Sequence, residues 1–218
     1  MVDTAYRGLL ISDVDSTFLT QEVIELVADY AGVRDDVEEV TLRAMRGELD
    51  FAESLHHRVA ALKGLPATVI DEVCEQLVPT PGAVELASEA IERGWLVALV
   101  SGGFEEIITP LAEQVGIQSV LANRFEVADG HLTGRVDGPI VDREAKAMQA
   151  RFLSAAHGVP RERIIALGDG ANDIDLMAEA GLAVGFHPKP ALREVVDLVI
   201  DGPSLDPVRE HLARLDGF

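Results

Sequence analysis

The chain has 218 residues and a formal net charge of −20, which argues against nucleic acid and anionic membranes as partners because both would repel it. Hydrophobic residues make up 48% of the sequence and aromatic residues 5%, which suits an aliphatic α/β core with a smaller second unit. A lone Cys74 excludes an internal disulfide, and without a signal peptide or an apolar run of about 20 residues we expect a cytoplasmic protein.

The first predicted strand covers residues 9–11 and leads directly into two carboxylates, Asp13 and Asp15. Carboxylates two residues apart beyond a strand end can converge on one Mg²⁺. One of them can also attack phosphorus while the other moves a proton. The pair is a weak signal by itself, because acidic residues in this position also cap the following helix.

The next stretch, from residue 20 to residue 78, carries no strand signal and predicts four helices. They are expected over residues 21–30, 35–46, 50–64 and 67–77. Asp50 followed by Glu53 is a capping-box pattern that marks the start of the third helix. We therefore expect a small helical cap over residues 20–78, inserted into a catalytic core formed by residues 1–19 and 79–218.

The second strand, predicted over residues 96–100, is followed by Ser101, Gly102 and Gly103, and a helical pattern begins near Phe104. The N–H groups at such a helix start can bind an anion, and glycine allows a phosphate to approach the backbone closely. A serine cap followed by a flexible turn is the alternative, and this segment taken alone favours it.

Two further features precede the next strand. Short alternating stretches on either side of residues 128–130 predict a β-hairpin. Lys146 then lies in a helical stretch, where a single lysine is usually a solvated surface residue. The chain has only three lysines against fifteen arginines, however, so a lysine in this place suggests charge compensation at a phosphoryl group.

The densest acidic motif follows the strand predicted over residues 164–167 and covers residues 168–173, Gly-Asp-Gly-Ala-Asn-Asp. Asp169 at the strand tip is the expected third ligand of Mg²⁺, and Asp173 opens the next helix. Ca²⁺ would also suit such a loop, but the spacing of an EF-hand is absent. Strands over residues 183–186 and 198–200 complete a doubly wound, mostly parallel, Rossmann-like α/β sheet with the motifs at its carboxyl edge.

In this order, the four motifs resemble those of the haloacid dehalogenase superfamily of phosphotransferases. The similarity extends over essentially the whole chain and is greatest to the phosphoserine phosphatases, including the segments at residues 121–124 and 129–134. Two departures are local. Ser12 stands where these enzymes usually carry a large apolar residue, and Thr20-Gln21 varies a polar dipeptide. We expect neither to take part in the chemistry.

The resemblance implies a Mg²⁺-dependent phosphatase that hydrolyses O-phospho-L-serine through an aspartyl-phosphate, a step of serine biosynthesis. Asp13 would be the nucleophile, and Asp15 would protonate the leaving group and later activate water. Mg²⁺ would be held by Asp13, Asp169 and the backbone carbonyl of Asp15. The groups expected to surround the phosphoryl oxygens are Ser101, Gly102, Lys146 and Asn172, with Asp173 supporting Mg²⁺ or Lys146 from behind.

The substrate would be recognised by two residues of the cap. Phosphoserine carries an ammonium group, which needs an acceptor carboxylate, and a carboxylate, which suits the fork of an arginine. The resemblance places these roles on Glu22 and Arg58. Taken alone, Glu22 would be a first-turn helix residue and Arg58 part of a solvated face.

Two other functions remain open. The same chemistry could act on another small phosphomonoester or transfer the phosphoryl group to another acceptor. A non-enzymatic phospho-acceptor domain, as in response regulators, also combines an aspartyl-phosphate, Mg²⁺ and a lysine. The expected cap and the second carboxylate of the first motif argue against it, because a signalling domain has no need to enclose a substrate. The oligomeric state also stays open.

Overall fold

The structure is a computed structural model that describes residues 6–45 and 48–215. Within these residues, six parallel strands form one sheet of order β3-β2-β1-β6-β7-β8. The strands are β1 Leu9–Ser12, β2 Leu96–Phe104, β3 Ser119–Asn123, β6 Ile164–Gly168, β7 Leu182–Phe186 and β8 Leu198–Ile200. The chain runs outward from β1 through β2 to β3 and then returns to place β6 on the other side of β1. Ligands of such sheets bind at this switch point, beyond the carboxyl ends of the strands.

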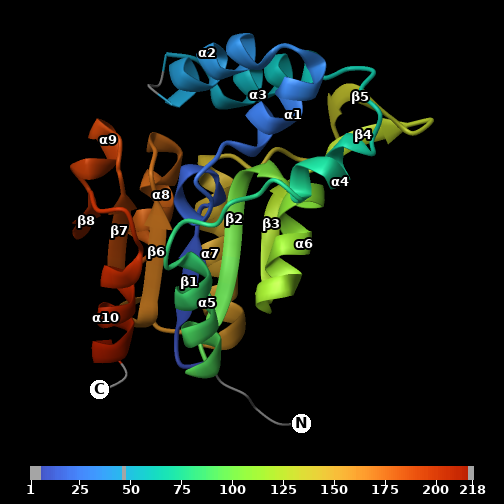
Figure 1. The fold of residues 1–218 in the computed structure, drawn as a ribbon. Helices are drawn as coiled ribbons and strands as arrows, with labels where there is room; N and C mark the ends of the chain where they lie inside the picture. The colour runs from blue at the N-terminus through green and yellow to red at the C-terminus, as the bar shows by residue number, and fades with distance from the viewer. Residues whose placement is uncertain (1–5, 46–47, 216–218) are drawn as a thin grey trace.

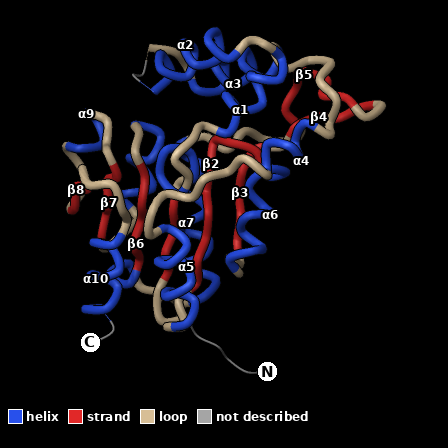
Figure 2. Tube along the Cα trace, viewed as in Figure 1, coloured by secondary structure: helices blue, strands red, loops and turns tan. Residues whose placement is uncertain are grey.

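Helices cover both faces of the sheet, as Figure 2 shows. Leu10 of β1 packs in the cluster that includes helices α5 (Ala83–Glu92), α6 (Glu105–Val115) and α10 (Asp206–Leu215). Leu9 and Ile11 belong to the opposite cluster with α7 (Arg143–His157), α8 (Ile174–Ala178) and α9 (Pro190–Arg193). Burial of a whole aliphatic side chain stabilises the folded state by about 1.5–3 kcal/mol. Because helices cover both faces of the sheet, successive residues of a strand are buried and its sequence is a continuous apolar run. The predicted doubly wound α/β fold is confirmed.

The four predicted helices are present as α1 (Val23–Ala31), α2 (Arg34–Met45), α3 (Phe51–Ala60) and α4 (Val69–Cys74), which we call the cap helices. Figure 1 shows α1, α2 and α3 above the carboxyl end of the sheet. Asp50 caps α3 as predicted, because its Oδ1 accepts from the N–H of Glu53 at 3.0 Å. Helices α3 and α4 are shorter than predicted, since they end in i→i+3 bonds such as Leu62 N to Val59 O and Gln76 N to Val73 O.

The chain crosses between the sheet and the cap helices twice, and the two crossings pair with each other. The N–H of Thr20 donates to Val78 O at 3.0 Å. The Gln21 side chain donates to Gln76 O at 2.8 Å and accepts from the N–H of Val78 at 2.7 Å. The polar dipeptide that departs from the family pattern therefore fastens the two crossings together.

The predicted hairpin is formed by β4 (Phe125–Ala128) and β5 (His131–Val136), with Asp129 and Gly130 at positive φ in the turn. Its second strand also pairs with the chain that follows α3. The N–H of Gly64 donates to Leu132 O at 2.8 Å, and the N–H of Leu132 donates to Leu65 O at 2.9 Å. The hairpin thus gives the cap helices a further attachment to the rest of the molecule.

Two strand predictions were incomplete. The edge strand β3 was missed; its apolar run covers only Val120, Leu121 and Ala122, and Ser119, Val120 and Leu121 are only half-buried. Strand β2 was predicted to end at Val100 but continues to Phe104, which pairs with Asn123 after a register shift. That shift belongs to the pairing with β3, so the sequence of β2 alone does not reveal it. None of the described helices has the length and apolar character needed to span a membrane.

Candidate active site

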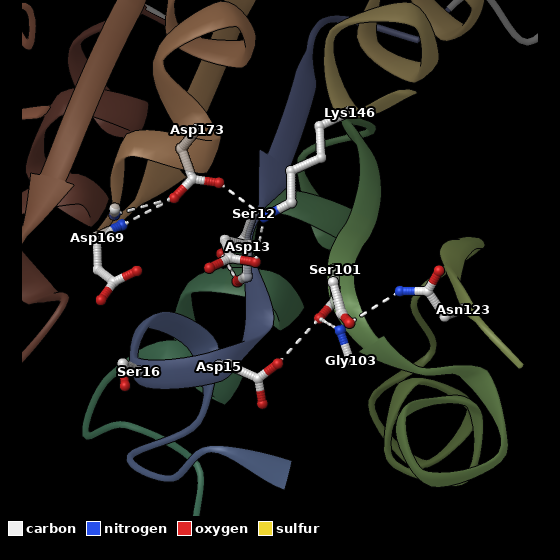
Figure 3. Close-up of polar contacts among 12 residues, drawn as sticks. Ser12, Asp13, Asp15, Ser16, Ser101, Gly103, Asn123, Lys146, Asp169 and Asp173 are labelled. Carbon is white, nitrogen blue, oxygen red and sulfur yellow. Dashed lines mark hydrogen bonds and ion pairs between the residues drawn. The ribbon is translucent and has the colours of Figure 1, made fainter. Parts of the chain in front are cut away.

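Asp13 and Asp15 leave the carboxyl end of β1 in different surroundings (Figure 3). Asp13 is buried, and its N–H donates to Leu167 O at 2.9 Å, which prolongs the pairing of β1 with β6. Asp15 lies in the wide turn η1 (Val14–Phe18), where Oδ1 accepts from the N–H of Val23 at 2.8 Å and Oδ2 accepts from Ser101 Oγ at 3.2 Å. Asp13 is therefore fixed by the sheet, and Asp15 by the start of α1 and the end of β2.

Lys146 is buried next to Asp13, with only 1% of its surface exposed. Its Nζ donates to Asp13 Oδ1 at 2.6 Å and to Asp173 Oδ1 at 2.7 Å, as Figure 3 shows. Burial alone would lower the pKa of Lys146, but the two carboxylates outweigh it and raise the pKa above its ordinary value. Both carboxylates favour the charged form of the ammonium group, and the surface reading of this lysine is wrong.

The loop after β6 brings two further carboxylates to the same place. Asp173 accepts with Oδ2 from the N–H groups of Asp169, at 3.2 Å, and Gly170, at 3.1 Å. Asp169 is buried and is contacted by the ammonium group of Lys189 through Oδ2. Both oxygens of Asp173 are thus engaged, one by Lys146 and one by the loop backbone.

This acidic cluster fits a divalent cation. Asp13, Asp169 and Asp173 each place a carboxylate oxygen within 4.8 Å of the others. Burial and Asp173 raise the pKa of Asp13 well above its ordinary value despite Lys146, and burial raises that of Asp169 to about 6 despite Lys189. Among the described residues, Asp13 Oδ2 and Asp169 Oδ1 accept no hydrogen bond. Hard cations prefer such oxygens, and a positive charge there would relieve the crowding of the buried carboxylates.

The end of β2 and the loop after β6 supply polar groups next to these carboxylates. Ser101 is fully buried and accepts from the N–H of Gly103 at 2.8 Å. The side chain of Asn123 donates to Gly102 O at 2.8 Å and holds this turn from β3. Asn172 Oδ1 is buried and has no hydrogen-bond partner among the described residues. An unpartnered amide oxygen beside a cavity is available to a hydrogen-bond donor of a ligand.

Glycine is required at position 103, because the chain passes very close to Asp15. A Cβ atom there would lie 2.8 Å from Asp15 Oδ2 and 2.8 Å from Val23 Cγ2. We predict that Gly103→Ala lowers the free energy of unfolding by about 1–3 kcal/mol, measured by denaturant titration. Gly202→Ala is the matched control, since a Cβ there meets no described atom within 4 Å. Equal stability of the two variants would contradict the prediction.

The predicted substrate residues meet the acidic motifs at one cavity. Its wall includes Asp13, Asp15, Glu22, Thr41, Phe51, Arg58, Gly102, Asp169 and Asn172. Ser101 and Lys146 are buried and reach this wall through their contacts with Asp15 and Asp13, and the buried Asp173 contacts Lys146. The structure therefore brings together all ten predicted site residues. Seven line the cavity, Ser101 and Lys146 contact Asp15 and Asp13, and Asp173 contacts Lys146.

Arg58 and Glu22 are both held in place rather than solvated. The Nε of Arg58 donates to Ser54 O at 3.3 Å, and Nη1 donates to Thr41 Oγ1 at 3.2 Å. Glu22 accepts from Ser16 Oγ at 2.7 Å, and burial followed by the charge of Asp15 raises its pKa to about 8. The solvated-face reading of Arg58 is wrong, because only 6% of its surface is exposed.

Sequence reasoning missed several residues of this site, namely Ser16, Thr41, Phe51, Asn123 and Lys189. Only Lys189 carried a usable signal, because it is one of three lysines in a chain that otherwise uses arginine. The others support or border the site through contacts between segments that are distant in the sequence.

Comparisons with known proteins agree with this geometry. The family model of haloacid dehalogenase-like hydrolases matches residues 10–178. The phosphoserine phosphatase SerB2 of Mycobacterium tuberculosis is 52% identical over 202 residues, which are 93% of this chain and 49% of that protein. The phosphoserine phosphatase of Lactococcus lactis is 43% identical over 211 residues, 97% of this chain and 98% of that protein. The chain thus spans about half of the first relative and nearly all of the second.

Solved structures show the same fold. A phosphoserine phosphatase with an analogue of its phospho-aspartyl intermediate superposes with a TM-score of 0.90 at 37% identity, covering 94% of this chain and 99% of that one. A substrate-bound phosphoserine phosphatase has the same TM-score and identity. Since the family model spans most of the sheet and all four motifs, the chain belongs to the haloacid dehalogenase-like hydrolases.

Proposed function

We propose that this protein is a Mg²⁺-dependent phosphatase that hydrolyses O-phospho-L-serine to L-serine and phosphate. The observation that carries the proposal is the single cavity in which Asp13 and Asp15 face Glu22 and Arg58. A phosphomonoester with an ammonium and a carboxylate group matches both ends of such a cavity. Two relatives and two solved structures that are phosphoserine phosphatases support this choice.

In this proposal, a carboxylate oxygen of Asp13 attacks phosphorus, and the bond from phosphorus to the serine oxygen breaks. Asp15 gives its proton to the departing oxygen. Burial raises the pKa of Asp15, so its protonated form is available closer to neutral pH than for an ordinary aspartate. Asp15 then takes a proton from the water that cleaves the aspartyl-phosphate, which returns both carboxyl groups to their starting state.

The remaining residues stabilise charge. Asp13, Asp169 and the backbone carbonyl of Asp15 would hold Mg²⁺, whose charge would offset that of the phosphoryl oxygens. Ser101, the N–H of Gly102, Lys146 and Asn172 would donate hydrogen bonds to those oxygens. Asp173 would act from behind, since it holds both Lys146 and the loop of Asp169.

Enclosure of the substrate is assigned to the cap helices. We propose that residues 20–78 form a cap and that residues 1–19 and 79–218 form the catalytic core. The chain leaves the core at Thr20 and returns to it at Val78, and these two crossing points are hydrogen-bonded to each other. This pairing supports boundaries of the cap at these residues. The product, L-serine, would place the reaction in amino-acid biosynthesis, which we expect in the cytoplasm.

Phosphate release from a panel of phosphorylated metabolites, with Mg²⁺ and with EDTA, tests the proposed activity. We expect O-phosphoserine to be the preferred substrate and turnover to require Mg²⁺. Adding alcohols as acceptors separates hydrolysis from phosphoryl transfer. A preference for another phosphomonoester would contradict the substrate assignment, and a single turnover without release of phosphate would favour a phospho-acceptor domain.

We predict that Arg58→Lys and Glu22→Gln each lower kcat/KM for phosphoserine by about 30-fold. A lysine cannot form two parallel bonds to a carboxylate. The substrate ammonium would favour the ionised form of Glu22 and gain a counter-charge from it, whereas glutamine cannot ionise. Hydrolysis of p-nitrophenyl phosphate, which has neither group, should stay within about threefold of the parent. The exposed Arg43→Lys and Glu39→Gln are matched controls that should change neither rate. Parallel losses on both substrates would contradict the specificity role.

A further inference from the structure

Lys189 is bound to Asp169 by two separate contacts. It follows β7, and its N–H donates to the backbone carbonyl of Asp169 at 2.8 Å. Its ammonium group donates to Asp169 Oδ2. Pro188 and Pro190 stand on either side and restrict the backbone around this lysine. The lysine is therefore directed at one particular carboxylate.

The charges of the site explain what such a contact can do. Asp13 and Asp173 share the ammonium group of Lys146. Among the described residues, the only ion pair of Asp169 is the one with Lys189. Lys189 also interacts electrostatically with Glu22 and Asp13. Without this lysine, a buried carboxylate would face other carboxylates with no positive charge in contact, which is costly in a low-dielectric interior.

The position of Lys189 differs from that of Lys146. Lys146 is fully buried, whereas 32% of the Lys189 side chain is exposed. Lys189 lines a second, open cavity together with Ser16, Thr80 and His187, and Asp169 belongs to the walls of both cavities. Lys189 therefore reaches Asp169 from this second cavity, where water can solvate its charge.

We propose that Lys189 holds Oδ2 of Asp169 and serves as the counter-charge of this carboxylate while no divalent cation is bound. The inference rests on the metal site of the proposed function. By holding Oδ2, Lys189 leaves Oδ1 for the cation. Its positive charge also opposes a second positive charge nearby, so the same contact that stabilises the metal-free protein weakens metal binding.

Lys189→Met tests this balance without any substrate. We expect EDTA-treated Lys189→Met to melt at a lower temperature than the parent, because Asp169 loses its counter-charge. Isothermal titration with Mg²⁺ should give a dissociation constant about tenfold lower than that of the parent. Mg²⁺ should also raise the melting temperature of this variant more than that of the parent. Lys189→Arg, which keeps the charge, should restore the parent's melting temperature and affinity.

Lys63→Met is the matched control, because it removes the same charge from an exposed lysine after α3. It should leave the melting temperature and the Mg²⁺ affinity unchanged. If metal-free Lys189→Met does not fold, Lys189→Gln, which keeps a hydrogen-bond donor, should show the same tighter binding. Unchanged or weaker Mg²⁺ binding by the position-189 variant would overturn the proposal. If the parent protein binds Mg²⁺ but does not hydrolyse phosphoserine, that result would contradict the proposed function and leave the proposal for Lys189 standing.

Discussion

Asp13→Asn should lower the rate of phosphoserine hydrolysis by about 10⁴-fold or more. An amide oxygen is a poor nucleophile toward phosphorus, and the change also removes one anionic oxygen from the proposed metal site. The fold should survive, because Lys146 keeps its ion pair with Asp173 at 2.7 Å and remains paired in the interior. The loss would therefore be one of chemistry and not of structure.

The measurement is a rapid-quench experiment with labelled phosphoserine, which follows both phosphate release and label bound to the protein. Parent protein should accumulate bound label that hydroxylamine removes, and Asp13→Asn should show none. Asp175→Asn is the control, since it makes the same change at an exposed carboxylate paired with Arg143. Activity of Asp13→Asn within about tenfold of the parent would contradict the nucleophile assignment.

Features that depend on neighbouring residues in the sequence could be predicted. The strands β1, β6 and β7 are continuous apolar runs because both of their faces are buried. Asp13 and Asp169 could be placed at one edge of the sheet because parallel strands end at the same edge. The capping pattern of Asp50 and Glu53 likewise predicts the start of α3 without any tertiary information.

Features that depend on contacts between distant segments could not be predicted. The place of Lys146 at the site was expected from the resemblance, but its complete burial and its ion pair with Asp13 follow from the meeting of β1 with α7. Arg58 is held by Thr41 of the preceding cap helix, a contact that the helical pattern of either segment does not reveal. The contact of Lys189 with Asp169 joins two loops at the edge of the sheet. For Arg58 and Lys189, the sequence shows the residue type but not its partner.

Asp15→Asn should slow the two steps in which Asp15 transfers a proton, namely departure of the serine oxygen and attack of water on the aspartyl-phosphate. It should have less effect on the attack of Asp13 on phosphorus. An asparagine cannot protonate the serine oxygen, so phosphoserine hydrolysis should fall by about 10²–10⁴-fold. The leaving group of p-nitrophenyl phosphate departs without protonation, so formation of the aspartyl-phosphate from it should fall by less than about tenfold. The asparagine Oδ1 can still accept from the N–H of Val23, which keeps the turn η1 attached to α1.

The comparison is decided by single-turnover kinetics on both substrates, because the later hydrolysis of the aspartyl-phosphate also needs Asp15. A burst of p-nitrophenol followed by slow turnover would show that Asp13 still attacks while water is no longer activated. The Asp15→Asn change would also remove the acceptor of Ser101 Oγ, so Ser101→Ala serves as the control for that contact alone. Ser101→Ala removes the same hydrogen bond without removing the carboxyl group, so it should not produce this difference between substrates. Equal losses of the first step on both substrates in Asp15→Asn would mean that Asp15 acts by positioning or charge and does not protonate the leaving group.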